Sequence, residues 1–184
     1  MAKQWDETDV MERLRDPARC RDAFGDVITH YSQPLYWHIR KMVIDHDDAN
    51  DVLQNTFLKA WSNIEYFRGD AKLSTWLYKI AINESLTFIE KERRRLNVPL
   101  DGDDSFLINN LPADEWFDGD ELRLELQKAI NALPEKQRLV FNMRYFDEMK
   151  YEEMSEILGT SVGALKASYH HAVKKIEQIF SERD

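Results

Sequence analysis

The sequence has little of the material from which cross-linked, metal-bound or membrane-spanning proteins are built. A single cysteine, Cys20, excludes an internal disulfide, cannot form a zinc site by itself and is typical of a cytosolic (cytoplasmic) protein. No apolar run approaches the roughly 20 residues of a membrane-spanning helix, so we expect no membrane insertion. The polar N-terminal segment MAKQWDETDVMERLRD is not typical of a secretory signal.

Motifs for common enzyme chemistry are missing as well. The sequence has no P-loop, no dinucleotide-binding glycine motif and no nucleophile elbow. His30, His38 and His46 recur about two helical turns apart, too far for one ion, and His170 and His171 point about 100° apart on a helix. We therefore expect no metal, no cofactor and no catalytic residue, so the protein is not predicted to be an enzyme.

Strand signals are absent, and helical periodicity extends over most of the chain. One apolar stripe comprises Ala23, Val27, Tyr31, Leu35 and Ile39. A second comprises Leu53, Phe57, Ala60, Trp61 and Ile64. A third helix is predicted to begin at Ser74 or Thr75, an amphipathic helix spans 121–132, and Pro134 can open a helix that reaches Met143. The prediction is an all-α protein.

The acidity of the chain is concentrated in one segment. Residues 97–120 contain seven acidic and no basic side chains, out of a net charge of -9 for the whole chain. We interpret this segment as a flexible linker between two small helical domains, 1–96 and 121–184. Its apolar side chains either lie on another surface or pack on the neighbouring domains; they are Phe106, Leu107, Ile108, Leu111, Trp116 and Phe117.

The segment 151–175 has the layout of a helix-turn-helix. Gly159 can end the first helix in a left-handed conformation, and Ser161 can cap the second. The second helix opposes an apolar stripe to a cationic face of Lys166, His170, Lys174 and Lys175, as a helix in a major groove requires. The pattern favours DNA binding, although any two packed helices joined by a short turn share its caps and stripe.

A second segment, EYFRGDAKLSTWLYKIAINESLTFIEKERRR, interleaves aromatic and basic residues. Phe67 follows a helix in a loop beside Arg68, and Lys79 and Asn83 follow on the next helix, which ends in a basic run. Aromatic rings stack on unpaired bases and cations hold phosphates, so this combination suits partly melted DNA. The alternatives are that Trp76 belongs to the core and that the basic run complements the helix dipole.

These two segments together resemble the extracytoplasmic-function (ECF) type of RNA polymerase sigma factor, of the sigma-70 family. The first signature is DDANDVLQNTFLKAW followed by FRGDAKLSTWLYKIAINE, and the second is LPEKQRLVFNMRYFDEMKYEEMSEILGTSVGALKASYHHAVKKI. The resemblance implies a region 2 domain at 1–96 and a region 4 domain at 121–184. It also implies core RNA polymerase, promoter DNA and an anti-sigma factor as partners.

The resemblance further implies a role for particular residues. The residues expected to bind core polymerase are Asp51, Gln54 and Asn55. Those expected at the −10 element are Phe67, which would capture a flipped base, with Arg68, Lys79, Asn83, Arg93 and Arg94. Those expected at the −35 element are Arg144, Ser161, Lys166, Ala167, His170 and His171.

The chain departs from the family pattern on the second helix of the helix-turn-helix. Arginines are common in the family at the positions of Ser168, His171 and Val173, and their absence here predicts different −35 contacts. Two other functions stay open at this point. A two-domain helix-turn-helix regulator would bind duplex DNA without polymerase, and a helical adaptor would bind polymerase without promoter selectivity.

Overall fold

Helices form all the regular structure of the residues that the computed structural model describes, which are 4–100, 104, 106–109 and 121–182. This confirms the all-α prediction. The N-terminal helices are α1 Glu7–Leu14, α2 Cys20–Val43, α3 His46–Ser62, the short η1 Ile64–Tyr66, and α4 Leu73–Arg95. After α5 Phe106–Asn109 come α6 Glu121–Asn131, α7 Glu135–Phe141, η2 Asn142–Phe146, α8 Tyr151–Leu158 and α9 Val162–Ser181.

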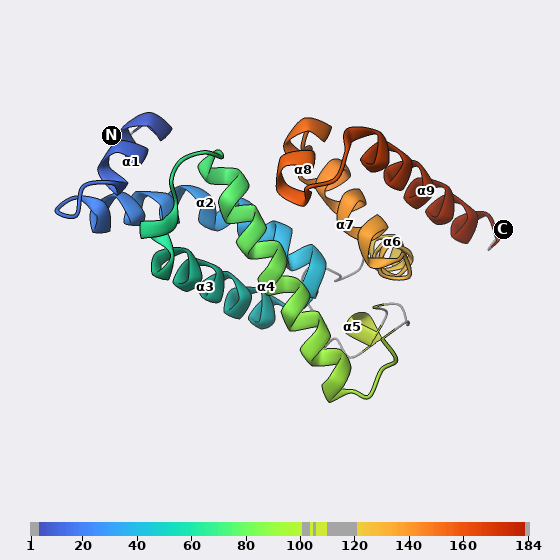
Figure 1. The fold of residues 1–184 in the computed structure, drawn as a ribbon. Helices are drawn as coiled ribbons and strands as arrows, with labels where there is room; N and C mark the ends of the chain where they lie inside the picture. The colour runs from blue at the N-terminus through green and yellow to red at the C-terminus, as the bar shows by residue number, and fades with distance from the viewer. Residues whose placement is uncertain (1–3, 101–103, 105, 110–120, 183–184) are drawn as a thin grey trace.

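The core of the N-terminal half lies where α2, α3 and α4 pack together (Figure 1). The predicted stripe of α2 is buried in full, from Ala23 to Ile39. The stripe predicted for α3 is partly wrong, because Val52 and Thr56 face the core while Trp61 is 41% exposed. Thr56 can be buried because its hydroxyl donates to the Val52 carbonyl, 2.8 Å away, which satisfies its only donor.

Two predicted helix boundaries differ from the structure. Helix α4 begins at Leu73, before Ser74, and its cap residue Lys72 makes no side-chain capping bond. Pro134 stands just before α7, and the α-helix then changes at Asn142 into the π-turn η2, so an unbroken helix to Met143 is not observed. A π-turn holds one residue more than an α-turn, which periodicity alone does not indicate.

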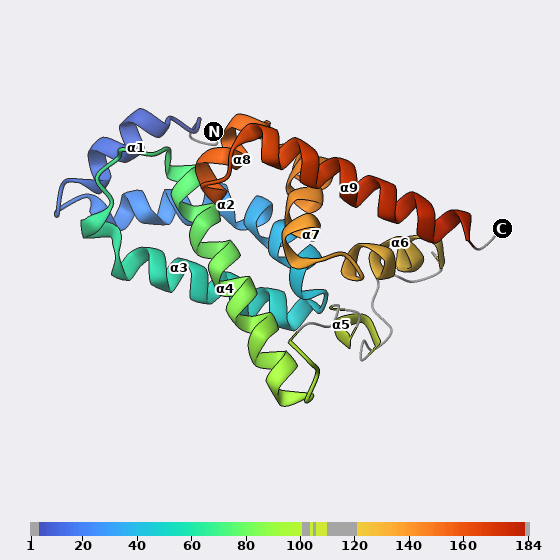
Figure 2. The same ribbon diagram turned by 45° about the vertical axis from the view of Figure 1, so that its right-hand side comes forward.

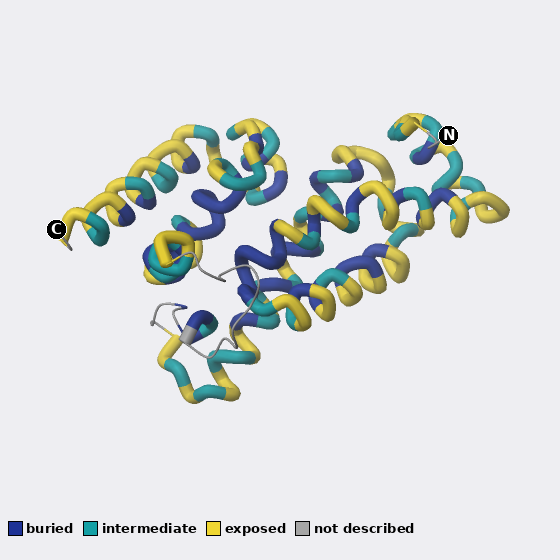
Figure 3. Tube along the Cα trace, turned by 180° about the vertical axis from the view of Figure 1, so that it is seen from behind, coloured by how far each residue is buried: buried dark blue, intermediate teal, exposed yellow. Residues whose placement is uncertain are grey.

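The two halves of the chain pack against each other. Figures 1 and 2 both place α8 beside α4, and one apolar cluster continues from α2 and α4 into α7, α8 and α9. Residues 38–44, at the C-terminal end of α2 and its cap, are buried throughout (Figure 3). There Asp147, which follows η2, accepts from His38 Nδ1 at 2.6 Å and from Lys41 Nζ at 3.0 Å.

A second polar contact joins the halves through the acidic segment. Asp104, 1% exposed, forms ion pairs with Arg93 at the end of α4 and with Arg138 on α7. Burial lowers the pKa of Arg138, and the charge of Asp104 acts against that shift. Phe106 and Ile108 are also buried, so these two side chains pack on the neighbouring helices. The predictions for Leu111, Trp116 and Phe117 concern residues outside those that the structure describes.

Candidate nucleic-acid and polymerase interfaces

Phe67 stands between η1 and α4, at the start of a short loop. Its ring stacks on that of Trp76, with 4.6 Å between centroids and 22° between planes. Both rings are half-buried, whereas Arg68 is exposed. Gly69 has a φ of 79°, a left-handed conformation that favours glycine, and it reverses the chain towards α4. One face of the Phe67 ring is therefore already covered by Trp76 within the protein.

Helix α4 continues this surface, but it does not present all the residues predicted for it. Lys79 and Asn83 are four residues apart and exposed, so they lie on one face. Arg94 is exposed and pairs with Glu90. Arg93 is largely buried, because its guanidinium pairs with Asp104 and donates to the Pro99 carbonyl at 2.8 Å. In this structure Arg93 connects α4 to the segment after it, and its side chain is only 11% exposed.

The residues predicted to bind polymerase share an exposed face of α3. Asp51, Gln54 and Asn55 are all exposed. One turn further, Leu58 is 58% exposed on the same face, and Trp61 follows it. The face is thus polar at its N-terminal end and apolar at its C-terminal end.

An apolar hollow of about 720 Å³ adjoins this face, between α2 and α3. Its lining includes Gln54, Leu58 and Trp61 from α3 and Ile28 from α2. Sequence reasoning missed Ile28 and Leu58. The spacing of Leu58, four residues after Gln54, is the signal that places it on the predicted polymerase-binding face.

The helix-turn-helix is built as its sequence predicts. Gly159 ends α8 with a φ of 65°, and the Ser161 hydroxyl accepts from the Ala164 N–H at 3.2 Å to cap α9. The solvent side of α9 carries the predicted contacts, all exposed: Lys166, Ala167, His170 and His171. Ser161 is exposed as well, although its hydroxyl is engaged in the cap.

The Tyr151 ring connects Arg144 to this surface of α9. Its guanidinium donates to the Met149 carbonyl at 2.9 Å and lies 4.9 Å from the centre of the Tyr151 ring. Lys166 approaches the same ring, with its Nζ at 5.7 Å. Cation–π attraction of this kind holds both side chains over the first turn of α8. Two predicted −35 contacts from separate elements are therefore brought together by Tyr151.

Within the described ranges, no group of three or more histidine, cysteine, aspartate or glutamate side chains is arranged to hold a metal ion. Among the helices of those ranges, none is both long and apolar enough to cross a membrane.

Comparison with known protein families agrees with this geometry. The family described as sigma-70 region 2 matches residues 27–95, and the family described as sigma-70, region 4, matches residues 123–176. The first match contains the Phe67 loop and the α3 face, and the second contains the helix-turn-helix. These are the two modules of an RNA polymerase sigma factor, in the order expected.

Similar proteins narrow the class. The ECF RNA polymerase sigma factor SigW of Bacillus subtilis is 32% identical over 158 residues, which cover 82% of this chain and 84% of SigW. The ECF RNA polymerase sigma-E factor of Escherichia coli is 26% identical, over 96% of this chain and 95% of that protein. The chain belongs to the ECF sigma factors of the sigma-70 family. The two family matches and the likeness to SigW support the function of a sigma factor and not that of a two-domain regulator.

Solved structures share the fold. The structure of CnrH in complex with the cytosolic domain of CnrY matches with a TM-score of 0.71 at 20% identity, covering 97% of this chain and 99% of that chain. The sigma factor RpoE of Bartonella quintana, in complex with the anti-sigma factor NepR, matches with a TM-score of 0.66 at 22% identity, covering 86% and 96%.

Proposed function

We propose that this sigma factor contacts promoter DNA through two separate surfaces and core RNA polymerase through a third. The Phe67 loop and the exposed face of α4 recognise the −10 element and stabilise its melted strand. The helix-turn-helix recognises the −35 element through α9 and Arg144. The exposed face of α3 with Asp51, Gln54 and Asn55 binds core polymerase. The protein works in the bacterial cytoplasm, without a catalytic residue or cofactor of its own.

The observation that carries this proposal is the position of Phe67. Its ring is half-buried against Trp76 at the edge of a face that bears Lys79 and Asn83. Extruding a base from duplex DNA costs a few kcal/mol, and an aromatic partner at the exit offsets part of that cost. The neighbouring cations hold the phosphates on either side. Melted DNA fits this arrangement better than duplex DNA does.

The test is promoter melting by reconstituted holoenzyme. Phe67→Ala should reduce permanganate reactivity of the −10 region at least about fivefold, because stacking contributes about 1–3 kcal/mol per base. Affinity for core polymerase should stay within twofold. Tyr66→Ala is the matched control, since Tyr66 is the preceding residue and its side chain is 77% exposed. If Phe67→Ala lost core affinity as well, or if both variants lost melting equally, the role assigned to Phe67 would be wrong.

Promoter selectivity separates this function from that of an adaptor. The wild-type chain added to core polymerase should start transcripts at one defined position downstream of its −35 and −10 elements. Scrambling either element should abolish these transcripts. Core binding without selective transcripts would favour the adaptor instead.

We also propose an anti-sigma factor as a regulatory partner. Two solved relatives of the fold are described as complexes with an anti-sigma factor or with the cytosolic domain of another protein. The apolar hollow beside Leu58 and Trp61 offers a surface for such a partner, in competition with polymerase. An inhibitor of this kind should lose affinity on Leu58→Asp in parallel with core polymerase.

A further inference from the structure

We propose that α1 positions the Phe67 loop, and that Glu7 is the positioning residue through which it acts. Helix α1 precedes both matched family regions, which begin at residues 27 and 123, so neither of these two regions includes it. The inference rests on the proposed role of Phe67 in promoter melting. It concerns how the loop is held and not which base it captures.

The first observation is that α4 begins without a cap of its own. Among the residues that the structure describes, the Lys72 side chain makes no capping bond, and the first turn of α4 has no acidic residue. The first amide groups of a helix lack intrahelical acceptors, and its N-terminus carries a partial positive charge. The Glu7 carboxylate supplies what is missing, because its Oε1 accepts from the Leu73 N–H at 3.2 Å. The cap of α4 thus comes from 66 residues earlier in the chain.

The side chains around this contact lead directly to the loop. The pKa of Tyr31 is raised to about 12, first by burial and then by the negative charge of Glu7, and its hydroxyl bonds to Ser74. Glu7 therefore lies close to the first turn of α4. Trp76 follows within the same turn, and Phe67 stacks on it. A movement of this turn moves the ring on which Phe67 rests.

The second observation is that the loop passes closely over α1. A Cβ atom added to Gly69 would lie 2.9 Å from Arg15 Nη2 and 3.1 Å from Met11 Cε. The same two side chains line a hollow of about 740 Å³ whose other walls include Tyr66 and Phe67. Met11 and Arg15, in α1 and just after it, therefore lie against the loop at Gly69, and Glu7 holds the end of the loop at Leu73.

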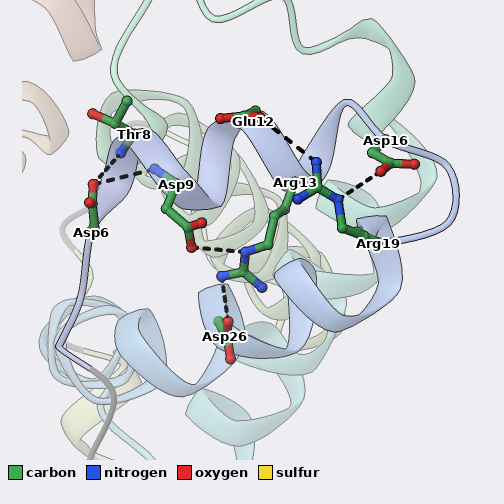
Figure 4. A network of polar contacts seen from close by, with 8 residues as sticks. All are labelled: Asp6, Thr8, Asp9, Glu12, Arg13, Asp16, Arg19 and Asp26. Atoms are coloured by element: carbon green, nitrogen blue, oxygen red, sulfur yellow. Dashed lines mark hydrogen bonds and ion pairs between the residues drawn. The ribbon is translucent and has the colours of Figure 1, made fainter.

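The third observation is that α1 is itself anchored. Figure 4 shows Arg13 reaching from α1 to α2, where it donates to Asp26 at 2.6 Å while also donating to Asp9 at 2.9 Å. The hydrogen bond to Asp26 is the main cause that raises the pKa of Arg13. Asp6 caps α1 by accepting from the Thr8 N–H at 2.9 Å. A helix fixed to α2 in this way can transmit position to α4.

The experiment compares Glu7→Ala with Glu7→Gln in the full chain, assembled with core polymerase. Loss of a helix cap corresponds to about a fivefold change in an equilibrium, so Glu7→Ala should reduce permanganate reactivity at the −10 element about fivefold. Glu7→Gln keeps an oxygen acceptor for the Leu73 N–H, so it should restore most of the reactivity. Glu12→Ala is the matched control, because it removes an exposed acid from the same helix. Core affinity should be unchanged in all three variants.

A double-mutant cycle shows whether Glu7 acts through Phe67. If it does, Glu7→Ala should cause no further loss of melting in a Phe67→Ala background. Additive losses would overturn the inference, and so would unchanged melting in Glu7→Ala. A parallel fall in core affinity without rescue by Glu7→Gln would mean a merely structural role, which also overturns it. If Phe67→Ala itself melts promoters normally, it is the proposed function of the loop that fails.

Discussion

The Phe67 loop and the helix-turn-helix both carry side chains that we propose contact DNA, yet they are held in opposite ways. In the helix-turn-helix, the Gly159 turn, the Ser161 cap and the Tyr151 ring all lie within the motif itself. The Phe67 loop depends on Glu7 and on the support of α1 beneath Gly69, more than fifty residues away. The difference teaches that a motif can be locally complete or can borrow its conformation from elsewhere.

This difference also determines how far the structural effect of a substitution should extend. A change to a local cap should alter the few residues beside it, because no other element depends on that bond. A change to a distant contact should alter every element that the contact joins. Three substitutions test that distinction, and hydrogen exchange reports for each how far the effect spreads.

The largest effect is expected from Asp104→Ala. The substitution leaves Arg93 and Arg138 without their buried partner, and breaking such a pair costs about 3–5 kcal/mol. The free energy of unfolding in urea should fall by about that amount, with faster exchange at the end of α4 and in α7 together. Asp22→Ala, which removes an exposed acid on α2, should change it by less than about 0.5 kcal/mol. Faster exchange in only one of the two helices, α4 or α7, would contradict the prediction.

An intermediate effect is expected from Asp147→Asn. Burial favours a higher pKa for Asp147, but the hydrogen bond and charge of His38, together with Lys41, outweigh it and hold the pKa below the ordinary value of 3.8. A carboxylate with a lowered pKa stabilises the fold above its ordinary pKa, and that contribution is lost as the pH falls through the lowered value. The variant should therefore be about 2 kcal/mol less stable at pH 7. The difference should shrink below pH 3.8.

The measurement is chemical denaturation at pH 7 and at successively lower pH, with exchange followed in α2 and η2. Both elements should lose protection together in Asp147→Asn, since the contact joins them. Glu148→Gln is the neighbouring control, because Glu148 is exposed. Equal stability of Asp147→Asn and wild type at pH 7 would show that the contact contributes nothing.

The smallest effect is expected from Ser161→Ala. Loss of the cap should cost about 1 kcal/mol, because the Ala164 N–H loses its acceptor. Faster exchange should appear in the first turn of α9 and not in α8 or α2. Ser161→Asp, which keeps a capping oxygen, should retain the protection. Faster hydrogen exchange in the N-terminal half as well would show that the helix-turn-helix is not held by local contacts alone.

The sequence predicted those parts of the fold whose causes are local. The caps at Gly159 and Ser161 follow from residue type, and the α2 stripe from periodicity, so both are observed as expected. The sequence predicts too late a start for α4, because the acceptor that caps its first turn belongs to Glu7. Similarly, no local signal shows that Arg93 pairs with Asp104 instead of facing outward with Arg94.

The surface of α3 marks a further limit. Periodicity cannot tell which of two neighbouring apolar stripes faces the core when both are present. Periodicity predicts Trp61 in the core and does not single out Leu58, although both are exposed in a helix whose core side includes Thr56. The polar members of the predicted polymerase surface, Gln54 and Asn55, were easier to place outward because burying them without partners is costly.

The π-turn η2 makes the structure more sensitive to an inserted residue in this stretch than to a replaced side chain. Arg144, within the turn, faces Tyr151, and Asp147, just after it, faces α2, so one short stretch serves two surfaces. Each residue added to or removed from a helix rotates the later residues by about 100°. A single insertion in 142–146 would therefore turn Asp147 away from His38 even if every other side chain were kept. Variation among relatives should accordingly tolerate replacements in this stretch more readily than insertions.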